Sequence, residues 1–257
     1  MSRTVRLLPT LLLALAACGD STAPSKVGAD LTTDVAVAST DAAKNEIALL
    51  ALDEDAAQAA ARGCTYDAAT VRWSCASATE GTLSITRSFS FFSETGAAQS
   101  SYSPTETGSI NFVTTAAGSR SGQGSLATVA RHRTVTVSGL AGTETERVWN
   151  GSGVDTLDVE VQGTQTTRRY TMRSAVTMSD VVFNVPRSAQ PYPQSGQLRY
   201  DIIVTQTADG AQSVTRVTTR RVTITFNGTA AVPMQVGTLG CTLYLDTRGV
   251  ACGAPPA

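Results

Sequence analysis

Apolar and polar residues alternate from Cys64 almost to the end of the chain, and this alternation limits the fold more than any other feature of the sequence. Successive side chains of a β-strand point to opposite faces, so a period of two is the signature of half-buried strands. The pattern places Leu83, Ile85, Phe89 and Phe91 on one face, with serine and threonine on the other. Further runs of the same kind contain Leu157, Val159 and Val161; Tyr170, Met172, Val176 and Met178; Leu198, Tyr200, Ile202 and Val204; and Val222, Ile224 and Phe226.

No stretch with helical periodicity separates these runs. Parallel strands need crossovers of a dozen or more residues, usually helical, so the strands must be antiparallel. Asn150-Gly151, Asp209-Gly210 and Asn227-Gly228 favour tight hairpins between them. The sequence therefore predicts an all-β fold, an antiparallel sheet of about twelve strands, over residues 63–253. A half-barrel, a barrel and a sandwich all fit this pattern.

Residues 18–62 differ in composition from the rest of the chain. They hold eight acidic and three basic residues, whereas from Gly63 onward thirteen acidic residues accompany fifteen arginines and no lysine. Residues 18–40 are small and polar and cannot bury a core, so we expect a flexible tether. Residues 41–62 are rich in strong helix formers and predict a short helical segment, with Thr40 or Asp41 as the cap at its start and Gly63 at its end.

The first seventeen residues have the layout of a secretory signal peptide. Arg3 and Arg6 form a basic start, and the apolar run that follows, 7–17, ends in small residues. A membrane-spanning helix needs about 20 apolar residues, which this run does not reach. We therefore expect residues 1–17 to be removed on export.

Leu15-Ala16-Ala17-Cys18 resembles the lipobox of bacterial lipoproteins. The resemblance covers only the leader. It implies that Cys18 is acylated and becomes the first residue of the mature chain. The lipid on Cys18 then anchors the protein to a membrane. In this family an aspartate directly after the cysteine marks retention in the inner membrane; Gly19 stands there instead, which favours the outer membrane. An ordinary signal peptide cut near Ala17 is the alternative.

Four further cysteines form two pairs with the same spacing. Each pair begins Gly-Cys-Thr, has ten residues between its cysteines and carries turn residues midway: Cys64 with Cys75, and Cys241 with Cys252. Opposed residues of a hairpin lie close enough for a disulfide. We expect the bonds 64–75 and 241–252, among three possible pairings. A zinc site would need closer cysteine spacing and better suits a reducing compartment.

Motifs for catalysis and cofactors are missing from the sequence. One histidine rules out a multi-histidine zinc site, and no GxSxG, P-loop or GxGxxG pattern occurs. Loss of Arg3 and Arg6 with the leader changes the formal net charge from −1 to −3, which gives no electrostatic case for nucleic acid. We therefore expect neither a cofactor nor a metal, and enzymatic activity is the less favoured option.

A surface hydrolase acting on polysaccharide is nevertheless one of two functional hypotheses. Glu144 and Glu146, two apart on a strand, would share a face, with their α-carbons about 6.5–7 Å apart, and Trp149 nearby can stack a sugar. His132 would assist them, although a histidine between two arginines is usually a surface residue. An exposed strand that makes cross-strand pairs is the simpler interpretation.

Arginines recur on the predicted strands. Arg131 and Arg133 share a face of one predicted strand, and Arg216 and Arg220 share a face of another. Arg169 shares a strand face with Thr167 and Thr171. Such guanidinium groups can hold an anionic ligand. Pairing with acidic residues of neighbouring strands, in a way that keeps exposed strands apart, is the stronger interpretation.

The leading hypothesis is a lipid-anchored protein of the cell envelope whose β domain has a non-enzymatic binding or structural role. Its partners would be the membrane and a hydrophobic or anionic envelope ligand, with no nucleic acid. Candidate ligand-lining residues are Phe89, Phe91, Tyr200, Ile202, Ile224 and Phe226.

Overall fold

The computed structural model describes residues 63–253, apart from 81, 123–124, 163–166, 188–189, 209–213 and 248. The predicted leader (1–17), tether (18–40) and helical segment (41–62) lie outside the described residues. The described part is all-β, as expected, and forms one antiparallel sheet. Its strands are β1 Cys64–Asp67, β2 Arg72–Cys75, β3 Ala78–Glu80, β4 Leu83–Ser93, β5 Ala98–Gln99, β6 Thr107–Gly122, β7 Ser125–Ser138, β8 Glu146–Gln162, β9 Thr167–Asn184, β10 Ser195–Ala208, β11 Val214–Thr225, β12 Ala231–Val236, β13 Leu239–Tyr244 and β14 Gly249–Cys252.

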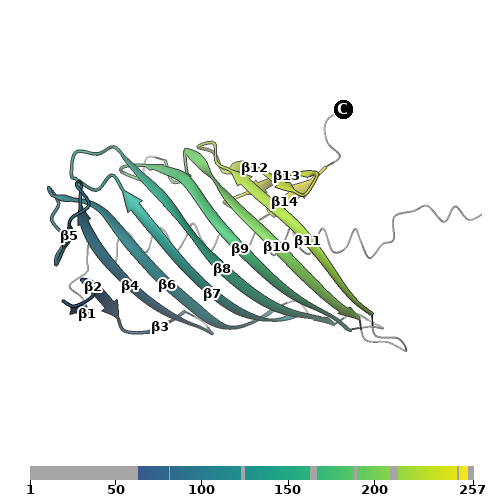
Figure 1. The fold of residues 1–257 in the computed structure, drawn as a ribbon. Helices are drawn as coiled ribbons and strands as arrows, with labels where there is room; N and C mark the ends of the chain where they lie inside the picture. Colours follow the sequence, from purple (N-terminus) through teal and green to yellow (C-terminus); the bar gives the residue numbers. More distant parts are fainter. Residues whose placement is uncertain are drawn as a thin grey trace, which may run out of the picture.

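The sheet is a meander in which neighbours in sequence are neighbours in space. Its order is β1-β2-β4-β6-β7-β8-β9-β10-β11-β12-β13-β14, and β3 and β5 pair with β4 beside this path. Long strands, β6 to β11, form the twisted and curved centre of the sheet (Figure 1). Because β1 and β14 do not pair with each other, the described sheet is open rather than closed into a barrel, and it has no second sheet to make a sandwich.

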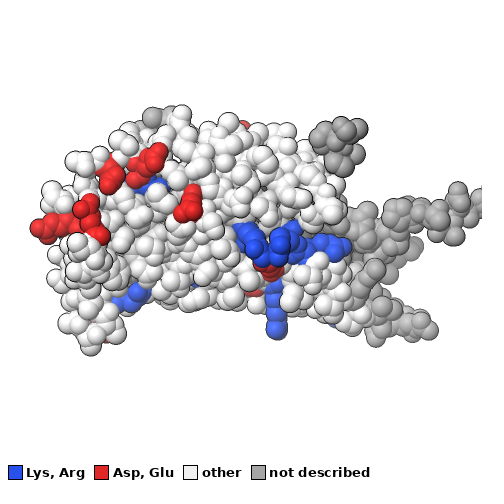
Figure 2. All heavy atoms as spheres, turned by 45° about the horizontal axis from the view of Figure 1, so that its top comes forward, with Lys and Arg blue, Asp and Glu red and all other residues white. Residues whose placement is uncertain are grey.

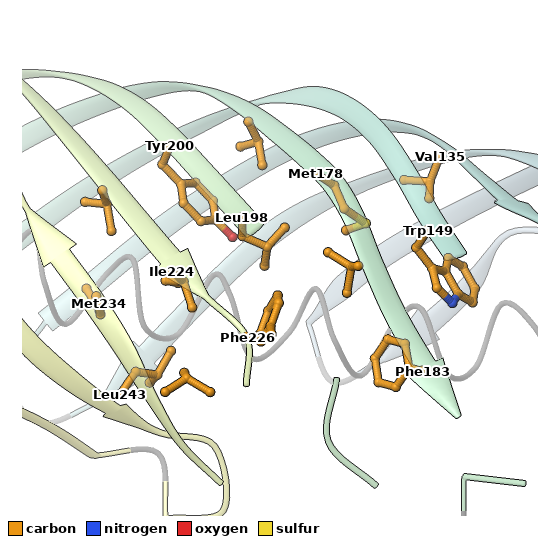
Figure 3. Close-up of a cluster of buried hydrophobic side chains, with 14 of the residues drawn as sticks. Val135, Trp149, Met178, Phe183, Leu198, Tyr200, Ile224, Phe226, Met234 and Leu243 are labelled. Atoms are coloured by element: carbon orange, nitrogen blue, oxygen red, sulfur yellow. The ribbon is translucent and has the colours of Figure 1, made fainter. Parts of the chain in front are cut away.

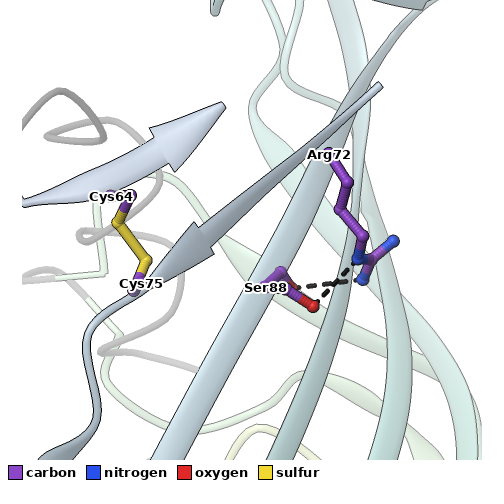
Figure 4. The surroundings of a disulfide bond; sticks show 4 residues. All are labelled: Cys64, Arg72, Cys75 and Ser88. Carbon is purple, nitrogen blue, oxygen red and sulfur yellow. Dashed lines mark hydrogen bonds between the residues drawn. A yellow bond between two sulfur atoms is a disulfide. The ribbon is translucent and has the colours of Figure 1, made fainter. Parts of the chain in front are cut away.

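Each end of the sheet is a disulfide-linked hairpin. In β1 and β2, Cys64 lies opposite Cys75, and in β13 and β14, Cys241 lies opposite Cys252. Both pairs are bonded, with 4.0 Å between their α-carbons, so the predicted disulfides are confirmed. Figure 4 shows the bond between Cys64 and Cys75. Beside the first hairpin, Arg72 Nε donates to Ser88 Oγ of β4 at 2.8 Å, which ties this end of the sheet to its longer strands.

The two faces of the sheet differ in burial. Phe89 of β4, Phe112 of β6 and Val135 of β7 lie side by side in register and are at most 5% exposed. The face on which they lie is called the inner face below, and the opposite one the outer face. On the outer face, Thr134 next to Val135 is exposed, whereas Ser90 next to Phe89 is 5% exposed. The alternation of the sequence therefore marks the core correctly.

The sheet has fourteen strands, two of which, β3 and β5, are only three and two residues long. One local prediction needs correction. Asn150-Gly151 is not a turn but lies within β8, at a register shift against β9. There the Asn150 side chain accepts from the backbone N–H of Asp180 at 2.8 Å and donates to its carboxylate at 3.0 Å, so the polar pair supports a β-bulge.

Candidate functional site

An apolar surface covers the inner face from β2 to β13, and it contains the six predicted ligand-lining residues. Their exposed fractions lie between 0% and 5%. Phe89 and Phe91 belong to β4, whereas Tyr200, Ile202, Ile224 and Phe226 lie on or directly after β10 and β11. Four strands separate the two groups, about 24 Å across the sheet at the usual strand spacing. All six belong to one buried cluster, part of which is drawn in Figure 3, and their ligand-lining role stays a prediction.

Aromatic rings connect β4 to β8 within this cluster. The ring of Phe112 lies 6.2 Å from that of Phe89 and 6.2 Å from that of Trp149, measured between centroids. The Arg187 guanidinium lies 3.8 Å above the Phe183 ring and 5.7 Å from that of Trp149. Trp149 is 0% exposed, so the predicted stacking of a sugar on this ring is wrong.

A cluster of three charged side chains interrupts the apolar inner face. Arg131 and Arg133 of β7 contact Asp155 of β8, and the side chains are only 9%, 5% and 10% exposed. Arg133 holds both carboxylate oxygens, with Nη1 2.7 Å from Oδ1 and Nη2 2.8 Å from Oδ2, and Arg131 Nε donates to Oδ1 at 3.2 Å. The predicted pairing with a neighbouring strand is confirmed for these arginines, but their predicted position on an exposed strand is wrong.

A glycine makes room for this charged cluster. Gly153 lies opposite Arg133 in the register of β7 and β8. A Cβ at Gly153 would lie 2.1 Å from the carbonyl oxygen of His132 and 2.8 Å from Arg133 Nη1. Any larger residue would therefore push the guanidinium away from Asp155, so the glycine is part of the cluster.

A similar but exposed cluster lies on the outer face. Asp201 of β10 accepts from Arg221 Nε of β11 at 2.7 Å and from Arg199 Nη2 at 2.6 Å. These hydrogen bonds, first that of Arg221 and then that of Arg199, hold the pKa of Asp201 below its usual value. Arg169 and Glu160 form another exposed pair, 3.2 Å apart. Figure 2 shows acidic side chains directly beside the main group of basic ones on the face that it presents, with most other acidic side chains at the opposite end.

The three polar residues of the hydrolase hypothesis do not meet. Glu144 lies in the loop before β8 and lines a hollow of about 270 Å³ together with Glu94, whereas Glu146 starts β8 and lines another of about 510 Å³ together with Asn184. The expectation that both glutamates share one strand face is therefore wrong.

His132 is remote from both glutamates. It is exposed on the outer face of β7, opposite Val154 of β8. Val154 is eight residues along β8 from Glu146, roughly 26 Å at the rise of an extended strand. An exposed position agrees with the simpler interpretation of this histidine.

Comparisons with known proteins give no assignment: no protein-family model, curated protein or solved structure matches the chain. In the part of the chain that the structure describes, no helix has the length and apolar character needed to cross a membrane. Nor do residues 63–253, where described, contain a group of three or more histidine, cysteine, aspartate or glutamate side chains placed to hold a metal ion.

Sequence reasoning missed two charged residues of the core, Asp155 and Arg147. Arg147 is 7% exposed and donates to the backbone carbonyl of Gly139. Both residues lie an even number of positions from Trp149 on β8, so the alternation already places them on the inner face. Charged side chains usually lie at the surface, so their charge indicated the outer face. Only the pairing of β7 with β8 shows that Asp155 lies next to Arg131 and Arg133.

Proposed function

We propose that the protein is a lipoprotein of the bacterial cell envelope, anchored through acylated Cys18, with the outer membrane favoured over the inner. The pairing of the cysteines carries this proposal. Four of the five cysteines form the two hairpin disulfides, which suit an oxidising compartment. Cys18 is the one left over, and it stands in the lipobox sequence Leu15-Ala16-Ala17-Cys18.

The β domain of this proposed lipoprotein has a structural or protein-binding role rather than a catalytic one. Its inner face is tightly packed, with large side chains such as Trp149, Phe91 and Phe183 at most 1% exposed. A packed face of this kind favours a rigid scaffold over a carrier with an empty cavity. The hydrolase hypothesis has lost its main support, because Glu144 and Glu146 line separate hollows and His132 lies elsewhere.

Replacement of the lipid-bearing cysteine tests the anchor. We expect Cys18→Ser to abolish acylation and to move the protein from the membrane fraction to the soluble fraction, because the β domain has no other proposed attachment. Mass spectrometry of the purified chain and fractionation of cells measure the two effects.

A matched control leaves the leader and Cys18 unchanged and removes one of the two disulfides instead. The double variant Cys64→Ser, Cys75→Ser should remain acylated and membrane-bound, since it leaves the lipobox unchanged. Membrane association that survives Cys18→Ser would contradict the proposal.

A further inference from the structure

Strand β11 has a long edge that no described strand covers. On one side β11 pairs with β10 along its whole length, from Val214 to Thr225. On the other side β12 pairs only with Val222–Ile224. Within the described residues no strand pairs with 214–221 on this side, and Figure 1 shows β12 beside one end of β11 only.

Backbone hydrogen-bonding groups of alternate residues point to this open side. The carbonyl of Arg221 accepts from Gly237 N, which lies on the β12 side, whereas Phe226 N donates to Gly196 on the β10 side. Because the direction alternates along a strand, the N–H and C=O groups of Thr215, Val217 and Thr219 share the direction of Arg221. They form a row of donors and acceptors of the kind that an added strand uses.

Exposure along the edge agrees with this geometry. Thr215, Val217 and Thr219 are all exposed, and Val217 has 64% of its surface in solvent. The carbonyl of Thr219 accepts a hydrogen bond at 3.0 Å from Arg220 Nη1. The guanidinium of Arg220 therefore lies at this edge of the sheet.

The charge along the edge is of one sign. β11 contains Arg216, Arg220 and Arg221 and no acidic residue. Cross-strand pairs of opposite charge stabilise a sheet and like charges opposite each other destabilise it. Arg221 pairs with Asp201 of β10, which offsets its charge. A second copy of this chain, paired through the same edge, would still place arginines of both copies along one interface. The edge is therefore suited to an acidic strand and unsuited to its own copy.

We propose that the edge of β11 over 214–221 binds an extended acidic peptide of a partner protein as an added antiparallel strand. Thr215, Val217 and Thr219 supply the backbone hydrogen bonds. Arg220 selects a carboxylate of the peptide, because its guanidinium already lies at the edge, on the carbonyl of Thr219. This inference goes beyond the proposed lipid anchor and does not depend on it, because it rests on the pairing of β10, β11 and β12 alone.

Titration of the mature chain with a designed peptide tests the inference. The probe is the peptide Thr-Asp-Val-Thr-Val-Asp-Thr, blocked at both ends and fluorescently labelled. The control peptide has lysine in place of both aspartates. Anisotropy should show binding of the aspartate peptide at least tenfold tighter than that of the lysine peptide. Amide hydrogen exchange at Thr215, Val217 and Thr219 should slow at least tenfold when the aspartate peptide is bound.

Two variants separate edge pairing from loss of fold. Val217→Pro removes an N–H on the open side and leaves the bonds to β10, since proline is tolerated where its nitrogen faces solvent. Arg220→Glu reverses a charge of the edge. Each should weaken binding at least tenfold with an unchanged near-UV circular dichroism spectrum. Arg173→Glu, an equal charge change at an exposed position of β9, should change affinity less than twofold.

Several outcomes would overturn the inference. One is equal affinity for the two peptides, and another is binding without protection of the three amides. Protection that exists before peptide is added and does not depend on concentration would show that other residues of the chain cover the edge. Protection that grows with protein concentration would show that a second copy occupies it.

Discussion

Asp155→Asn should lower the free energy of unfolding by about 3–5 kcal/mol, the usual cost of breaking a buried ion pair. The asparagine keeps the shape of the side chain but removes the charge that Arg133 and Arg131 contact at 2.7 Å and 3.2 Å. With 5% and 9% of these side chains exposed, water does little to replace the lost carboxylate. Urea denaturation, followed by circular dichroism, measures the change from the shift in midpoint.

The outer face offers a control of matched chemistry. Asp201 also accepts from two arginines, but its side chain is 37% exposed and theirs are 45% and 61% exposed. Asp201→Asn should therefore cost no more than about 1 kcal/mol, the range of surface salt bridges. Equal losses for the two variants would show that Asp155 is not in a buried cluster, and the assignment of β7 and β8 to the core would fail.

Truncation of Trp149 should destabilise the fold by about 3–5 kcal/mol, as Trp→Ala substitutions in a core do. The side chain is 0% exposed, lies against Phe112 and has the Arg187 guanidinium 5.7 Å from its ring. The variant Trp149→Ala leaves a cavity and removes these contacts together. Thermal and urea unfolding of the purified domain both report the change.

Val154→Ala provides the control on the same strand. Val154 is 58% exposed on the outer face of β8, so its truncation should change stability by less than about 0.5 kcal/mol. A Trp149 variant that unfolds like the wild type would place this ring at the surface, and the stacking role in the hydrolase hypothesis would then return.

The alternation of the sequence predicted the faces of the sheet because burial in this fold changes with every residue. Leu198, Tyr200, Ile202 and Val204 are all at most 5% exposed, as their period of two requires. The disulfides were equally predictable, because two opposed cysteines in a short hairpin have few other partners. Both features depend on local sequence and therefore need no knowledge of distant pairing.

Features that depend on pairing between distant residues were not predictable. Arg131 and Arg133 lie on the face that the alternation assigns to the core, but charge alone argued for the surface. Their partner Asp155 is more than twenty residues away in sequence, and only the register of β7 with β8 places it opposite Arg131. Asn150-Gly151 likewise resembles a turn locally, and its bulge depends on Asp180 of β9.

Length explains the two strands that the sequence did not reveal. β5 pairs through Phe91 and Phe92 of β4 alone, and β3 through three residues. A period of two needs at least four residues to be recognised. Short strands that cover part of the β4 edge therefore leave no pattern to read, although they protect that edge from other strands.

Peptide mapping of the mature chain under non-reducing conditions, by mass spectrometry, tests the central claim most directly. The account predicts an acylated peptide that begins at Cys18 and two disulfide-linked fragments, one holding Cys64 with Cys75 and the other Cys241 with Cys252. A chain that keeps residues 1–17, or a bond between the first cysteine pair and the second, would contradict it.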